Sequence, residues 1–158
     1  MLYAFLCVCH CGHFEIGYCV SFFLVKACGS YQRAQNNLAR VVCQSRGHTD
    51  ARPLLRSLHW LPVRQRVTYK VALLTHKVRA TAIPAYLSDL IQTHVPIRTL
   101  RSSEAPLLAA PRTRTELARR AFSVVAPSVW NSLPADIRLC ESIPSFKRHL
   151  KTHLFILA

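Results

Sequence analysis

Hydrophobic positions recur with helical spacing most clearly over residues 62 to about 81. Valine and leucine return there every three or four residues, at Val63, Val67, Val71, Leu74 and Val78. This spacing places them in one narrow stripe along an α-helix. Pro62 suits the first turn of that helix, because its missing N–H would find no partner inside the helix. The pattern predicts one long amphipathic helix.

Two further stretches have the same period. Within residues 31–45 the apolar positions are Tyr31, Ala34, Leu38, Val41 and Val42. Near the C-terminus, Ser142 and Pro144 form a helix start signal. The apolar residues that share one face behind this signal are Phe146, Leu150 and Leu154. Both stretches are therefore predicted to be helices.

A polar connector over residues 45–50 separates the first of these helices from a short one. Gly47 is a stop signal in this connector, and Thr49 or Asp50 can cap a helix over residues 53–58. Pro84 starts another short helix, over residues 85–91. The sequence thus predicts a chain of short helices between the longer ones.

The apolar runs at 107–112 and 121–125 are different, because each has the length of a strand. Charged residues separate them, which favours a two-stranded β-hairpin. Pro127 then starts one or two helical turns over 128–133, and the segment 134–138 follows them. The predicted fold is mostly α, with several short to medium helices and a small β-hairpin.

Composition divides the chain at about residue 30. Of the 158 residues, 21 are Lys or Arg and 7 are Asp or Glu, for a formal net charge of +14. Residues 1–30 hold one base, Lys26, and one acid, Glu15, but five of the seven cysteines. We expect residues 1–30 to be a leader of unknown role, rich in cysteine and aromatic residues and disordered or loosely attached. Residues 31–158 then form one basic helical region that carries the whole charge excess.

The sequence indicates neither membrane insertion nor metal binding. The apolar run at 18–25 is far shorter than the ~20 residues that cross a bilayer, and no base precedes it as in a secretory signal. Cys7, Cys9 and Cys11 lack the knuckle spacing and the distant ligand pair of structural zinc sites. His149 and His153 lie four residues apart on a predicted helix but have no third ligand nearby. We therefore expect no metal, no cofactor and no membrane partner.

The acidic residues argue against an enzyme. Polymerases and nucleases hold divalent ions with paired carboxylates. The acids of the basic region stand apart from one another, at Asp50, Asp89, Glu104, Glu116, Asp136 and Glu141. The chain also has no glycine-rich phosphate loop and no Gly-x-Ser-x-Gly turn. The sequence therefore predicts a protein without catalytic activity and without a small-molecule substrate.

The charge excess favours a polyanionic partner. Sixteen of the 21 bases are arginine, whose planar fork pairs with phosphate oxygens. The residues predicted to contact phosphate are Arg66, Lys70 and Lys77 on the long helix, Arg112, Arg114, Arg119 and Arg120 at the hairpin, and Lys147, Arg148 and Lys151 on the C-terminal helix. Two other interpretations stay open: a solvated face beside a core-facing stripe, and arginine that merely reflects GC-rich codons.

Five stretches between residues 31 and 155 form an ordered set. They are Tyr31-Gln-Arg-Ala-Gln-Asn-Asn-Leu-Ala-Arg-Val-Val, Leu58-His-Trp-Leu-Pro-Val-Arg-Gln-Arg-Val-Thr-Tyr-Lys-Val-Ala-Leu-Leu-Thr-His-Lys77, Pro84-Ala-Tyr-Leu-Ser-Asp-Leu, Ala126-Pro-Ser-Val-Trp-Asn-Ser-Leu-Pro134 and Ser145-Phe-Lys-Arg-His-Leu-Lys-Thr-His-Leu-Phe155. In content and order this set resembles the C-terminal part of the reverse transcriptase polyprotein of non-LTR (LINE, jockey-like) retrotransposons.

The resemblance implies a non-catalytic fragment. In full-length relatives an endonuclease and a polymerase palm with a catalytic Asp pair precede this region, so no catalytic residue carries over. The implied role is non-specific RNA or DNA binding through backbone phosphates, inside the cell. The alternative is a degenerate relic or protein-packing module without nucleic-acid affinity. In that alternative Trp60, Trp130 and Phe146 serve only as core anchors.

Overall fold

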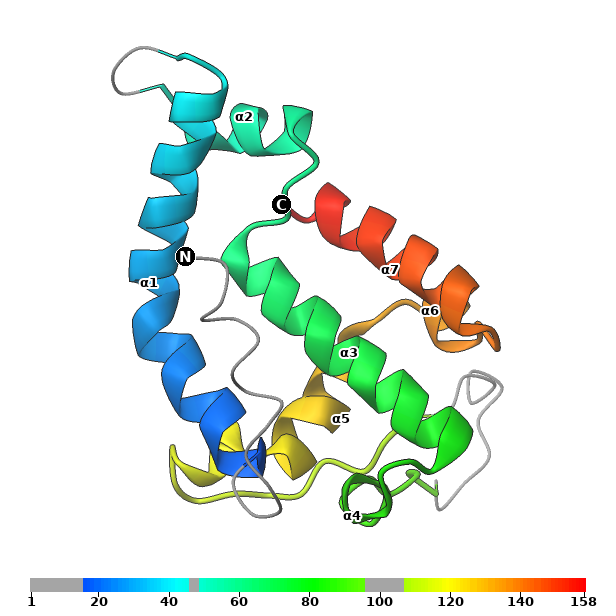
Figure 1. The fold of residues 1–158 in the computed structure, drawn as a ribbon. Helices are drawn as coiled ribbons and strands as arrows, with labels where there is room; N and C mark the ends of the chain where they lie inside the picture. Colours follow the sequence, from blue (N-terminus) through cyan, green and yellow to red (C-terminus); the bar gives the residue numbers. More distant parts are fainter. Residues whose placement is uncertain (1–15, 46–48, 96–106) are drawn as a thin grey trace.

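The computed structural model describes residues 16–45, 49–95 and 107–158 (Figure 1). Over these ranges the chain is mostly helical, which confirms the predicted fold class. The elements in chain order are α1 (Ile16–Val42), α2 (Ala51–Ser57), α3 (Val63–Thr81), α4 (Ala85–Ser88), the 3-10 helix η3 (Ala118–Arg120), α5 (Phe122–Ser132), α6 (Ala135–Arg138) and α7 (Ile143–Ile156).

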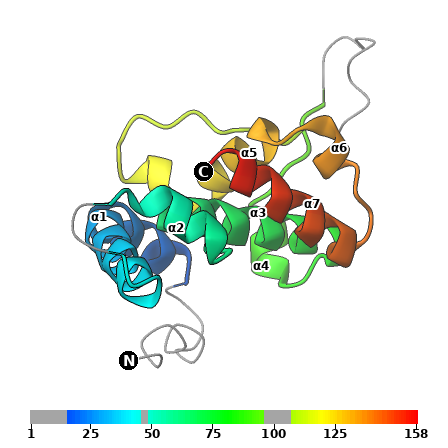
Figure 2. The ribbon, with the colours of Figure 1, turned by 90° about the horizontal axis from the view of Figure 1, so that it is seen from above.

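The helix α3 is the centre of the fold. It contacts α1, α4, α5 and α7. Figures 1 and 2 show α1 on one side of α3 and α7 on the other, with α7 running antiparallel to α3. The long helix predicted from the valine period is therefore the element on which the others pack.

Aromatic rings from three helices form the middle of the core. The side chains of Trp130 and Phe146 are completely buried, and their ring centroids lie 5.9 Å apart. The imidazole of His76 stacks on Phe146 with a centroid distance of 4.2 Å. Its Nε2 lies 2.8 Å from the carbonyl oxygen of Cys140, which links α3 to the segment before α7. The predicted anchors Trp130 and Phe146 are confirmed, whereas Trp60 is only half-buried.

Two faces of α3 are buried. One face, which includes Ala72 and His76, packs on the aromatic core. The other carries the predicted valine stripe, of which Val71 and Val78 are buried. The remaining stripe residues, Val63, Val67 and Leu74, are half-buried. Three of the charged side chains of α3, those of Arg66, Lys70 and Lys77, share one strip of the remaining surface, whereas Arg64 and Arg79, which are also exposed, lie off that strip.

Polar side chains fasten α1 to the start of α3. Gln32 Oε1 accepts the backbone N–H of Val63 at 2.8 Å, which satisfies one of the free donors at the N-terminus of α3. Gln35 Nε2 donates to the carbonyl oxygen of Leu61 at 3.0 Å. Gln35 and Ala39 are accordingly buried. The glutamines of the stretch that begins at Tyr31 therefore have a structural role.

The apolar stripe predicted on this helix is exposed instead. The exposed fractions are 50% for Tyr31, 53% for Leu38, 73% for Val41 and 51% for Val42. At about 100° per residue this stripe is turned roughly a quarter of a turn from the face that holds Gln35 and Ala39. Because the hydrogen bonds of the glutamines set the rotation of α1, the apolar stripe faces away from the core.

Local helix signals are largely confirmed. Asp50 caps α2, with its side chain accepting the backbone N–H of Arg52. Ser142 caps α7 in the same way through the N–H of Ser145. The face that Phe146, Leu150 and Leu154 share is buried, as their spacing predicts. The helix after Pro84 is shorter than predicted, because it ends at Ser88.

The predicted β-hairpin is wrong. Residues 122–125 belong to α5, for which Ala121 is the N-cap, and among the described residues the only β-type pairing is a single bridge between Thr93 and Leu108. A short apolar run cannot by itself distinguish a strand from a buried helix. Pro127 lies inside α5, where it is completely buried. The side-chain amide of Asn131 holds Leu108 through both its backbone N–H and its carbonyl oxygen, at 2.9 Å each, in place of a partner strand.

The break in composition at residue 30 is not a break in secondary structure, because α1 continues through it from Ile16. The predicted disorder concerns residues of which 1–15 lie outside the described part of the chain. Gly47 also lies outside it. The described helix before Gly47 ends at Val42, and Gln44 beyond it has a positive φ of 49°.

Leu150→Ala is expected to lower the free energy of unfolding by about 2–5 kcal/mol, because Leu150 is completely buried in the aromatic core. Leu157→Ala makes the same chemical change at a side chain that is 63% exposed, and should change stability by less than about 0.5 kcal/mol. Urea unfolding followed by circular dichroism measures both. Equal losses in the two variants would contradict the described core.

Candidate nucleic-acid interface

The strip of α3 between its two buried faces is basic. Arg66, Lys70 and Lys77 are all exposed, and at about 100° per residue they fall within about 40° of one another. Arg66 Nε donates a 2.8 Å hydrogen bond to the carbonyl oxygen of Leu61, and this residue is nevertheless exposed. The whole of α3 contains five Lys or Arg residues and no acid. The predicted ridge is therefore an exposed, uncompensated line of positive charge.

The exposed face of α7 is also basic and free of acids. Lys147, Arg148 and Lys151 are exposed, while the opposite face of the helix lies in the core. Lys151 Nζ lies 5.7 Å from the centroid of the Phe155 ring, so the stem of this lysine rests on the surface of its own helix.

Antiparallel packing brings these two basic lines to the same side of the α3–α7 pair. Lys147 and Lys151 are turned by about 80° from the buried face of α7, and the α3 ridge is turned by about 120° in the same sense from its aromatic-core face. In antiparallel helices, turns in the same sense point to the same side. We call this surface the α3–α7 basic face: Arg66, Lys70, Lys77, Lys147 and Lys151.

The other predicted phosphate contacts lie elsewhere. Arg119 and Arg120 belong to η3, and Arg112 and Arg114 precede it. The helix η3 contacts α1 and α5, whereas α7 contacts α3 and α6. Figure 1 likewise shows the yellow segment that holds η3 beside the lower end of α1, well apart from α7. The ten predicted residues therefore do not form one patch.

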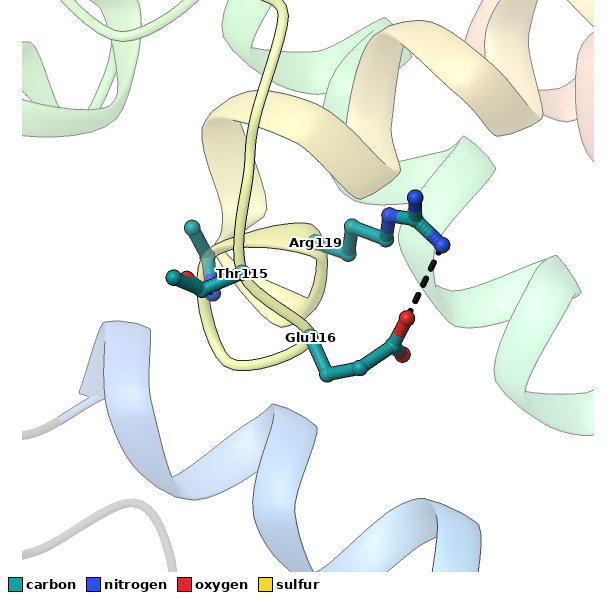
Figure 3. A network of polar contacts seen from close by, with 4 residues as sticks. Thr115, Glu116 and Arg119 are labelled. Carbon is teal, nitrogen blue, oxygen red and sulfur yellow. Dashed lines mark hydrogen bonds and ion pairs between the residues drawn. The ribbon is translucent and has the colours of Figure 1, made fainter.

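The charge near η3 is partly neutralised. Arg119 Nη1 lies 2.9 Å from Glu116 Oε1, and Figure 3 shows this pair on one side of the loop, with Thr115 directed away from it. Both side chains of the pair are mostly exposed. Arg120 is half-buried, while Arg112 and Arg114 are exposed. These arginines offer a weaker attraction to phosphate than the acid-free helices.

One further arginine, which sequence reasoning missed, contacts the core from an exposed position. The guanidinium carbon of Arg79 lies 4.7 Å from the centroid of the Trp130 ring. Burial, and then the nearby Arg138 guanidinium, lower the pKa of Arg79 from its usual value. The sequence held one signal for this position: Arg79 follows His76 by three residues and so shares its face of α3.

The described part of the chain holds no group of three His, Cys, Asp or Glu side chains that could bind a metal ion. Two of the exposed acids there already have a contact: the side chain of Asp50 caps α2, and the carboxylate of Glu116 pairs with Arg119. Among the helices of the described ranges, none combines the length and apolarity needed to span a membrane.

Comparison of the chain with protein-family models, with curated proteins and with solved structures finds no match.

Glu116→Gln is expected to strengthen oligonucleotide binding at low salt by no more than about fivefold, because it frees Arg119 from an exposed ion pair worth at most ~1 kcal/mol. Fluorescence anisotropy with a labelled oligonucleotide measures the change. Asp89→Asn removes an exposed acid outside any ion pair on the described residues and serves as the control. A larger gain from the control would show that Glu116 does not mask Arg119.

Proposed function

We propose that this chain is a non-catalytic nucleic-acid-binding module, derived from the C-terminal region of a non-LTR retrotransposon reverse transcriptase. The observation that carries the binding role is the α3–α7 basic face, which combines five exposed cations on two helices that contain no acid. RNA or DNA is bound there through backbone phosphates, without base-specific contacts.

The physical basis of this binding is the release of counterions. A nucleic acid carries a dense phosphate charge with condensed cations around it, and each phosphate neutralised by a Lys or Arg releases some of them. The flexible lysines of the face suit contacts to a backbone of variable geometry, since they act as point charges. Such contacts position a strand but carry no sequence information.

The proposed origin has a different support, which is the role of the residues in the resembling stretches. Gln32 and Gln35 attach α1 to the start of α3, and Asn131 holds the segment at Leu108. Trp130 and Phe146 build the core. These polar and aromatic residues each have a specific structural task, as expected of stretches that define a shared fold.

A second candidate function is protein packing, which the exposed apolar stripe of α1 favours. Tyr31, Leu38, Val41 and Val42 form a row of large apolar side chains at least half exposed. A contiguous exposed apolar row on a helix is typical of a surface that another protein covers. This function is compatible with nucleic-acid binding, because the α3–α7 basic face lies on different helices.

The double variant Lys70→Ala/Lys77→Ala is expected to weaken duplex binding and to reduce the slope of log K against log salt by about 1.8, since each lost phosphate contact contributes about 0.9. The loss should be the same for every oligonucleotide sequence. Anisotropy titrations over a range of salt concentrations measure the slope.

The control for this experiment is Arg52→Ala/Arg56→Ala, which removes the same charge from the exposed surface of α2. A similar fall in slope for both double variants would indicate attraction by net charge alone. Absence of binding to duplex, RNA and single strands at about 50 mM salt would exclude the proposed function.

Leu38→Ser/Val41→Ser is expected to leave the free energy of unfolding within about 0.5 kcal/mol per site of the parent chain, because both side chains are more than half exposed. Fluorescence of a hydrophobic dye added to the folded chain should fall, since the variant removes exposed apolar surface. A loss of several kcal/mol would mean that this stripe is packed within the fold and is not a docking surface.

A further inference from the structure

An exposed histidine lies in the turn that follows α2. His59 has a positive φ of 55°, and its backbone N–H donates to the carbonyl oxygen of Arg56, while the N–H of Trp60 donates to that of Leu55. These two hydrogen bonds form a Schellman turn with His59 at the left-handed position. Glycine is favoured at this position, because a Cβ raises the energy of a positive φ. The backbone of the turn therefore gives no reason for a histidine.

The side chain of His59 contacts α7 instead. Its ring meets the ring of Phe155 edge-on, with 6.4 Å between the centroids and 69° between the ring planes. Figure 1 shows the C-terminal end of α7 beside the connection between α2 and α3. Phe155 is half-buried and packs against the hydrophobic core. The imidazole is thus held in a defined place, although His59 itself is exposed.

Phe155 connects this histidine to the α3–α7 basic face. Lys147, Lys151 and Phe155 follow one another at intervals of four residues, so they share one side of α7. Lys151 Nζ lies 5.7 Å from the centroid of the Phe155 ring. The imidazole of His59 and the ammonium group of Lys151 therefore contact the same phenylalanine, and an exposed aromatic ring stands at one end of the basic face.

A strand whose phosphates contact Lys147 and Lys151 would bring its next bases to this ring. Histidine is one of the side chains on which unpaired bases stack. The edge-on contact with Phe155 uses at most one face of the imidazole, and His59 is exposed. The bases of a duplex are stacked on one another and do not reach such a ring. The arrangement thus suits a base of a single strand.

We propose that His59 is a stacking platform for an unpaired base, and that single-stranded RNA or DNA bound to the α3–α7 basic face gains this contact in addition to its phosphate contacts. The inference rests on the proposed function, because the cations of the face hold the strand. A basic surface combined with aromatic rings binds single strands without sequence preference, since every base has a π-face to stack.

His59→Gly in the full chain tests the platform without destabilising the fold, because glycine suits the positive φ of the turn. The variant removes the ring and keeps every Lys and Arg. It is expected to bind a labelled single strand of about 12 nucleotides about 5- to 150-fold more weakly than the parent chain, which corresponds to the loss of one stacked base. Duplex binding and the dependence of affinity on salt should not change, since no phosphate contact is lost. Fluorescence anisotropy measures both.

Gln44→Gly is the matched control. Gln44 is exposed and has a positive φ of 49° in a turn with the same two hydrogen bonds, at the end of α1. Glycine makes the same backbone change there, and single-strand binding should stay as in the parent chain. A strand with abasic sites in place of its bases is the second control, because it keeps the phosphates. The parent chain should bind it more weakly than the ordinary strand, whereas His59→Gly should bind the two strands with nearly the same affinity.

Equal affinity of His59→Gly and the parent chain for the ordinary strand would overturn the platform, as would equal affinity of the parent chain for the ordinary and the abasic strand. An equal loss in Gln44→Gly would also overturn it, because the effect would then come from the backbone change. In each of these cases the proposed function holds if Lys70→Ala/Lys77→Ala still reduces the salt slope. Absence of binding to every strand would instead exclude the proposed function, and the platform with it.

Discussion

Burial of aromatic rings against α3 is the interaction on which the rest of the structure depends. A chain with a net charge of +14 folds against the repulsion of its own cations, and four of its helices, α1, α2, α3 and α7, contain no acid at all. The only ion pair recorded on the described residues is exposed and contributes little. Trp130 and Phe146, both fully buried, therefore supply cohesion that electrostatics cannot, because burial of apolar surface does not depend on the sign of the charge outside.

The helices that sequence reasoning predicted well are those whose signals are local. The valine period of α3, the serine cap of α7 and the aspartate cap of α2 each depend on residues within one or two turns. The hairpin failed because 121–125 has no period long enough to separate a strand from a helix, and because Pro127 looked like a helix start. Only tertiary packing decides such a segment, here by burying Trp130 and Pro127 in the core.

The features of the candidate sites also divide into those that follow from local signals and those that depend on tertiary packing. Exposure of the bases on α3 and α7 follows from the helix period and could be predicted. Their position on one side of the helix pair could not, because it depends on the antiparallel packing of segments about seventy residues apart. The contact of Arg79 with Trp130 and the hydrogen bond from Arg138 to Leu133 likewise depend on how α3 and α6 pack on α5. The buried face of α1 could not be predicted either, because it is marked by the hydrogen bonds of two glutamine side chains and not by the predicted apolar stripe.

Because α1 is continuous through residue 30, a single helix joins two stretches of unlike composition. Starting a helix is costly, but lengthening one adds a hydrogen bond for each residue fixed. The part of α1 that Gln32 and Gln35 attach to the start of α3 can therefore be extended into a longer helix by the residues that precede it. An upstream stretch of foreign composition can become ordered simply by continuing the spiral, without packing requirements of its own. Residues at this end could be exchanged with little disturbance to the packing of α1 on α3.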